Sequence, residues 1–171
     1  MDMLELIKSR RSVRSYQDRD ISDEVLHRII DAAMTAPSAG NQQPWHFIVI
    51  RNRLKLEAVP QIHPYCKMIT KAPLAVLVCG DPDGKKWPQY WVQDCSAAVQ
   101  NLLLAARAEG VGSVWAGVYP LEERIDGCRK IFSVPDHIIP FAIIPMGWPK
   151  EKNVFKEVSR YRAELVHQDQ F

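Results

Sequence analysis

The sequence has little excess charge of either sign and no long apolar run. Its 171 residues carry 22 Lys and Arg against 20 Asp and Glu, which gives a formal net charge of only +2. A general nucleic-acid binder usually shows a broad basic face, so this class is disfavoured. No apolar stretch reaches the roughly 20 residues of a membrane-spanning helix. The first five residues also lack the basic and apolar regions of a secretory signal. We therefore expect a cytoplasmic protein that binds neither nucleic acid nor membrane.

Cysteine is scarce and widely spaced. The chain has four cysteines and no Cys-x-x-Cys pair. Secreted disulfide frameworks are denser, so we expect Cys66, Cys79, Cys95 and Cys128 to be reduced. His63 lies close enough in sequence to Cys66 to share a metal ion. Two ligands are too few for a structural zinc site, however, and no second pair follows. We expect no metal site.

The apolar pattern predicts a mixture of helices and strands in one domain that spans residues 1–171. Helices and strands do not alternate strictly, which favours an α+β architecture with a central sheet flanked by helices. A short first helix is expected to turn Leu4, Leu6 and Ile7 inward, and Ser22 is a plausible N-cap of the second. Helices are predicted at 2–9, 22–36, 53–59, 65–71, 89–109 and 121–132, and strands at 46–50, 74–79, 112–118 and 138–146.

A basic segment follows the first predicted helix. Arg10, Arg11 and Arg14 lie within five residues, with Ser12 between them. Arginine side chains match phosphate oxygens in bidentate fashion, and a serine hydroxyl adds a neutral donor. A solvated basic turn at a helix C-terminus explains the same residues equally well, because cations favour that end of the helix dipole. A nucleic-acid patch is a third reading, although the cluster is short and isolated.

A second segment of interest is the loop from Ala36 to Trp45, which prolines bound and small or amide residues fill. Such a loop lets the backbone approach a planar ligand closely. Asn41 and Gln43 can then hydrogen-bond heteroatoms at the ligand's edge. The alternative is an ordinary helix-to-strand loop whose Trp45 is anchored in the core, and taken alone the loop favours this alternative.

The glycine-containing segment from Gly110 to Pro120 does not match the dinucleotide-binding pattern. A G-x-G-x-x-G motif that starts at Gly110 needs a glycine where Trp115 stands, and these glycines follow a helix rather than a strand. Motifs for nucleophilic catalysis are also lacking, and nothing marks Asp94 and Glu109 as an acid/base pair. We therefore assign no catalytic side chain.

Taken together, these segments resemble the nitroreductase family of FMN-dependent enzymes. Each motif is weak alone, but their order and spacing agree over almost the whole chain. The matching segments are Arg10-Arg11-Ser12-Val13-Arg14-Ser15-Tyr16, Ala36-Pro37-Ser38-Ala39-Gly40-Asn41-Gln42-Gln43-Pro44-Trp45-His46-Phe47, Asp94-Cys95-Ser96-Ala97-Ala98-Val99-Gln100-Asn101-Leu102, Gly110 to Pro120, and Pro145-Met146-Gly147-Trp148-Pro149.

The resemblance implies a nitroreductase-like fold, with a mostly antiparallel central sheet in an intertwined homodimer, and FMN at the subunit interface. It also implies a set of FMN contacts. The arginines would serve the phosphate or the N1–C2 carbonyl edge of the flavin. The proline-bounded loop would come from the other subunit, and a C-terminal arginine would return to the phosphate. The residues so implied are Arg10, Arg11, Ser12, Arg14, Pro37, Ser38, Ala39, Asn41, Gln43, Trp115, Ala116, Gly117 and Arg160, with Lys156 and Arg162 as basic neighbours that could replace Arg160.

The function that the resemblance implies is hydride transfer. NADH or NADPH would reduce FMN, and an oxidised small molecule such as a nitroaromatic or a quinone would then take the electrons in a ping-pong mechanism. Two alternatives remain open. One is a flavin-binding or sensing protein without turnover. The other is a small nucleic-acid-binding module built on residues 8–14, against which the small net charge counts.

Overall fold

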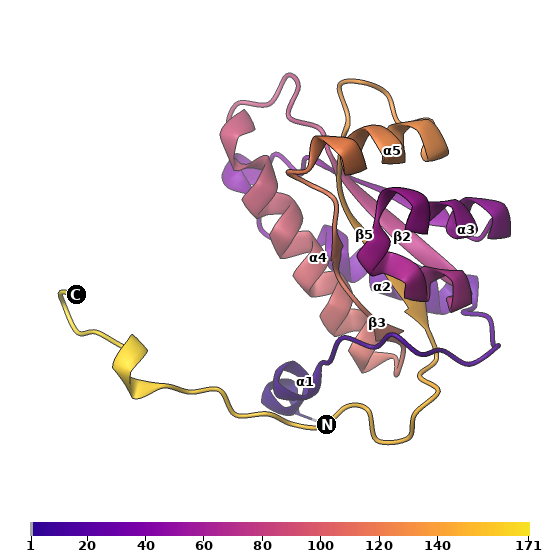
Figure 1. Ribbon diagram of the computed structural model, residues 1–171. Coiled ribbons are helices and arrows are strands. Elements are labelled where there is room, and N and C mark those ends of the chain that lie inside the picture. Colours follow the sequence, from indigo (N-terminus) through magenta and orange to yellow (C-terminus); the bar gives the residue numbers. More distant parts are fainter. Residues whose placement is uncertain (1) are drawn as a thin grey trace.

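The computed structural model describes residues 2–171 and is built around one antiparallel sheet (Figure 1). The strand order is β1-β2-β5-β3, and β4 also pairs with β5. Every pairing between named strands is antiparallel. The α+β class and the mostly antiparallel sheet predicted from the sequence are therefore confirmed. The strands are β1 (Trp45–Ile50), β2 (Leu74–Gly80), β3 (Gly112–Ser113), β4 (Ala116–Gly117) and β5 (Ile139–Gly147).

Helices cover both faces of this sheet, and the central strand β2 shows why. Its residues are all buried, as expected for an uninterrupted apolar run. Leu74, Val76 and Val78 join the core beneath α2 and α4, whereas Leu77 and Cys79 join the core beneath α3 and α5. The α-helices are α1 (Met3–Ser9), α2 (Asp23–Met34), α3 (Arg53–Ile62), α4 (Trp91–Ala108) and α5 (Glu122–Phe132). The 3-10 helices are η1 (Ala39–Asn41), η2 (Pro64–Lys71), η3 (Pro88–Tyr90) and η4 (Ala163–Leu165).

The longest helix, α4, forms the centre of the helical layer on one face of the sheet. Cys95, Val99, Leu102 and Ala106 recur at helical spacing and are completely buried. The helix stops before Gly110, whose φ of 77° lies in the left-handed region that glycine adopts without strain. The prediction of a largely buried helix at 89–109 is confirmed.

The first helix differs from its prediction. Asp2 caps α1 by accepting from the backbone N–H groups of Leu4 and Glu5. Leu4 and Ile7, expected to turn inward, are 63 % and 47 % exposed. The prediction was wrong for Leu4 and Ile7, whereas Leu6 is partly buried and lines a groove that α1 shares with α2 and α4.

The predicted strand at 112–118 is two short pieces in one register. Ser113 pairs with Met146 and Ala116 with Ile143, so the two residues between them lie opposite Pro145 and Ile144. Proline has no N–H to donate, and only the bond from the Val114 N–H to the Pro145 carbonyl remains there, at 3.3 Å. The ladder is therefore interrupted, and Trp115 occupies the gap.

The remaining predictions concern residues 65–71 and the tail. Residues 65–71 form the 3-10 helix η2 rather than an α-helix. The tail runs away from the sheet in Figure 1, and residues 156–171 are all exposed. Its apolar residues Leu165, Val166 and Phe171 contact no core, so their predicted docking role stays a prediction. Among residues 2–171, none of the helices combines the length and apolarity that crossing a membrane requires.

Candidate functional site

The basic segment leaves α1 and crosses the C-terminal end of α4. Arg107 of α4 donates from Nε to the Ser9 hydroxyl at 3.0 Å. The Val13 N–H then donates to the Ser113 carbonyl at 3.0 Å, and Ser12 pairs with Ser113 in a parallel bridge. These contacts place the basic segment beside β3, which is part of the glycine-containing segment that the sequence also singled out.

The C-terminal tail returns to this place. The Val158 N–H donates to the Lys8 carbonyl at 3.2 Å. Burial lowers the pKa of Arg10, and the charges of Arg11 and Arg160 lower it further. In the described part of the chain, none of these three arginines is paired with a carboxylate. Such a cluster of like charges favours an anion between its members.

The members of the cluster are not equivalent. Arg11 donates to the carbonyls of Lys8 and Arg10, so its guanidinium caps the end of α1. This matches the helix-terminus reading of the basic segment. Arg14, which lies outside this cluster, is exposed and makes a long 3.5 Å contact with the Ser12 carbonyl. Arg10 and Arg14 therefore have the freer guanidinium groups for a ligand.

Two hollows adjoin Arg14. One, of about 480 Å³, is lined by four cationic side chains and one carboxylate, namely Arg14, Arg53, Lys71, Lys150 and Asp18, together with Ser15, Tyr16 and Thr70. The other, of about 230 Å³, is lined by Ser12, Val13, Arg14, Ser15, Glu151 and Val154. Both favour a polar or anionic ligand beside Arg14.

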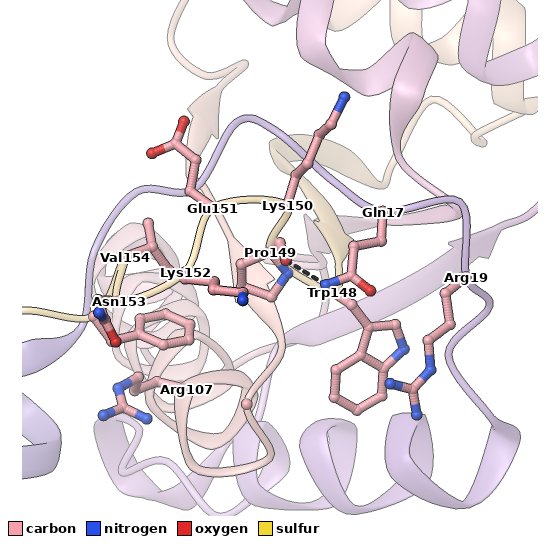
Figure 2. Close-up of a pocket in the computed structure, with 12 residues that line it drawn as sticks. Gln17, Arg19, Arg107, Trp148, Pro149, Lys150, Glu151, Lys152, Asn153 and Val154 are labelled. Atoms are coloured by element: carbon pink, nitrogen blue, oxygen red, sulfur yellow. Dashed lines mark hydrogen bonds between the residues drawn. The ribbon is translucent and has the colours of Figure 1, made fainter.

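A further hollow, of about 520 Å³, lies beyond the basic segment (Figure 2). Gln17 donates to the Pro149 carbonyl at 2.7 Å across it, and the Arg19 guanidinium lies 4.1 Å from the centre of the Trp148 ring. Arg107 forms part of its lower wall in Figure 2. None of the residues predicted to contact a cofactor lines this hollow, so its size alone does not make it the site.

The proline-bounded loop is held by a buried carboxylate. Asp94 of α4 accepts from the Ala39 N–H and from the Gln42 amide, each at 2.9 Å. Within the loop, the Gln43 amide donates to the Asn41 side-chain oxygen at 3.1 Å. The φ angles of Asn41 and Gln43 are 54° and 46°. Residues other than glycine seldom adopt this left-handed backbone conformation, and such strain concentrates at functional sites.

The loop and the arginine cluster lie at opposite ends of α4. Asp94 anchors the loop near the start of the helix, and Arg107 anchors Ser9 near its end. The interval exceeds three helical turns, which at 1.5 Å per residue is about 20 Å. Within one chain, therefore, the loop and the arginine cluster are too far apart to contact the same phosphate group.

The segment Trp115–Ala116–Gly117 carries an open backbone surface. Trp115 is 37 % exposed and meets Phe141 edge-on, with ring centroids 5.5 Å apart. A Cβ built on Gly117 would find no atom within 4 Å. Space above a half-buried strand residue is what a planar ligand lying on the backbone requires.

Sequence reasoning missed the residues that hold these segments in place. Asp94 was noted without a role, although a carboxylate on the buried face of a helix is itself a signal of a specific partner. Ser113, Arg107 and Arg124 were not singled out. Arg124 donates to the Gly117 carbonyl at 2.9 Å and so supports the open surface from behind.

Comparison with known proteins agrees with the motifs. The profile described as "Nitroreductase family" matches residues 7–78 and 57–148. Proteins of Methanothermobacter thermautotrophicus and Archaeoglobus fulgidus, both named "Putative NADH dehydrogenase/NAD(P)H nitroreductase", are 56 % and 46 % identical. The alignments cover 88 % of this chain and 79 % of the first relative, and 99 % of this chain and 99 % of the second.

A solved structure supports the fold over the same length. The FMN-dependent nitroreductase from Clostridium difficile R20291 superposes with a TM-score of 0.88 at 28 % identity, over 99 % of this chain and all of the other. The family profile covers most of the chain, and the resemblance inferred from the motifs is confirmed. This chain belongs to the nitroreductase family.

Proposed function

We propose that this chain, as one domain over residues 1–171, is an FMN-dependent oxidoreductase. It passes a hydride from NADH or NADPH to an oxidised small molecule such as a nitroaromatic or a quinone. The observation that carries the proposal is the cluster of Arg10, Arg11 and Arg160, which the bond from the Val158 N–H to the Lys8 carbonyl helps to assemble and which no carboxylate of residues 2–171 pairs. The names of the relatives agree with the reaction class.

The residues of the chain fit FMN at both of its ends. Arg10 and Arg160 supply charge for the phosphate, and Ser12 adds a hydroxyl donor. The open surface over Gly117 leaves room for a ring on the backbone. When bound, FMN supplies the hydride chemistry, and the protein supplies position and charge. Arg14 lies beside the hollow and can stabilise negative charge on the N1–C2 carbonyl edge.

The partner subunit supplies the other half of the site. The loop residues Pro37, Ser38, Ala39, Asn41 and Gln43 are ordered by Asp94, about 20 Å along α4 from the anchor of the arginine cluster. A second copy of the chain can bring this loop to the flavin. The exposed apolar residues of α1, with the groove between α1, α2 and α4, offer surface for such an association.

The first test is the visible spectrum of the purified protein and its turnover of NADH and NADPH with a quinone or a nitroaromatic. We expect a yellow protein with turnover. A yellow protein without turnover would favour the flavin-binding or sensing alternative. A colourless protein that takes up no FMN, but binds nucleic acid in a salt-dependent way, would favour the basic module. Cell fractionation tests the predicted cytoplasmic location.

Mixed dimers test the shared site. We expect two double variants to lose FMN binding, namely Arg10→Ala/Arg14→Ala and Asn41→Ala/Gln43→Ala. If each site takes its arginines and its loop from different chains, refolding the two variants together restores about a quarter of the wild-type sites, because half of the dimers then contain one intact site in two. No recovery, in a mixture shown to contain mixed dimers, would place each site within one chain.

A further inference from the structure

Arg124 occupies a position behind the proposed flavin surface. It lies in the first turn of α5, and its Nη1 donates to the Gly117 carbonyl at 2.9 Å. The same Nη1 lies 3.4 Å from Nε2 of His63, and the guanidinium lies 5.9 Å from the centre of the Tyr65 ring. Across residues 2–171, no carboxylate forms an ion pair with Arg124. Its charge is therefore directed at a backbone carbonyl rather than at an acid.

The His63 ring also contacts Arg124 and helps to hold its guanidinium in place. The imidazole is only 4 % exposed, and its Nδ1 has no hydrogen-bond partner among the described residues. Burial, and then the charge of Arg124, lowers the pKa of His63. In the tautomer that carries its proton at Nδ1, the neutral His63 ring accepts the Arg124 N–H at Nε2. Arg124 thus lies between the His63 ring and the Gly117 carbonyl.

Gly117 needs this support more than its neighbours do. β4 contains only Ala116 and Gly117, and the ladder is interrupted before it at Pro145. Glycine also has the largest conformational freedom of any residue. A Cβ on Gly117 would meet no atom within 4 Å apart from its chain neighbours, so β5, Arg124 and the His63 ring behind the strand supply the contacts to its peptide.

We propose that Arg124, seated by His63, is a positioning residue that fixes the Gly117 peptide as the surface on which the flavin ring lies. This inference rests on the proposed FMN function. Arg124 does not touch the cofactor in this arrangement, and it acts through the Gly117 carbonyl. Its loss frees the carbonyl, lets the two-residue strand shift, and so weakens and reorients the bound ring.

The test compares two arginines of the same helix. Arg129 also donates to backbone carbonyls, those of Asp136 at 2.8 Å and Ile138 at 3.4 Å. Arg124→Gln and Arg129→Gln therefore remove similar bonds, but only the first bond reaches Gly117. The measurements are the FMN dissociation constant, the visible circular dichroism of the bound flavin, and the Tm of the FMN-free protein.

We expect Arg124→Gln to weaken FMN binding about tenfold, because binding must then also order the Gly117 peptide, and to change the flavin dichroism. Arg124→Lys keeps the charge and one donor, so it should restore both to near the wild-type values. Arg129→Gln should lower the Tm while leaving FMN affinity within about twofold. If Arg124→Gln does not fold, His63→Ala, which removes only the seat, should change the dichroism in the same way.

Two results would overturn the proposal. One is an unchanged flavin dichroism and affinity in Arg124→Gln or, if that variant does not fold, in His63→Ala. The other is an equal loss in Arg129→Gln, which would show a general effect of α5. A wild-type protein that binds no FMN would instead overturn the proposed function, so the two failures are distinguishable.

Discussion

Adding a side chain at Gly117 tests the proposed flavin surface without disturbing the fold. A Cβ there would meet no atom within 4 Å, and the backbone is not in the left-handed region. Gly117→Val should therefore leave the Tm of the FMN-free protein unchanged or slightly higher, because β-branched residues suit strands. The three added carbons would instead stand where the flavin ring is proposed to lie.

The expected loss of affinity follows from overpacking. Forcing extra carbons into a filled site costs about 1–3 kcal/mol. Each 1.4 kcal/mol is a factor of ten, so the FMN dissociation constant should rise about 5- to 150-fold. Titration of the FMN-free variant, followed by flavin fluorescence, measures it.

Gly127 provides the matched control. A Cβ on this α5 residue would lie 2.5 Å from a side-chain carbon of Ile62, so Gly127→Ala should destabilise the fold. At roughly 2–4 °C per kcal/mol for a chain of this size, a cost of about 1–3 kcal/mol lowers the Tm by about 2–12 °C. FMN affinity should stay at the wild-type value. An unchanged FMN affinity in Gly117→Val would refute the placement of the ring over Gly117.

Three other predictions follow from buried polar and thiol groups. Burial raises the pKa of each of the four cysteine thiols to about 12, so a thiol reagent at pH 8 should label the folded protein very slowly and label four groups after unfolding. The lowered pKa of His63 means that the unfolded chain binds more protons, so stability should fall as the pH drops below about 6.5, and His63→Gln should reduce this slope in denaturant titrations at pH 7 and pH 5. Asp94→Ala leaves the Ala39 N–H and the Gln42 amide without their acceptor, so it should lower the Tm by about 5–10 °C and expose the loop to proteolysis, whereas an unchanged Tm would contradict the anchoring role.

The strands and helices with strong apolar patterns could be predicted from the sequence alone. β1, β2, β5 and α4 all lie within a few residues of their predicted bounds, because their burial is set by uninterrupted or helically spaced apolar residues. The break between β3 and β4 could not be predicted. It depends on Pro145, a residue of another strand whose missing N–H interrupts the ladder.

The same distinction holds for the candidate site. Motifs marked the residues that we propose touch the cofactor, and the role of Arg160 at the phosphate stays a prediction. The supporting residues were not marked. Asp94 acts on a loop 55 positions away, and Arg124 acts through a carbonyl, so neither role leaves a pattern in the local sequence.

Helix α4 also sets the angle between the two halves of the site. Asp94 and Arg107 differ by about 140° around the helix axis, as well as by about 20 Å along it, at 100° and 1.5 Å per residue. Each chain therefore points its loop and its arginine cluster in different directions. One residue deleted from the middle of α4 would turn one anchor by about 100° relative to the other. The length of this helix is thus a geometric constraint on the site, one that substitutions on its surface leave intact and that a single insertion or deletion would break.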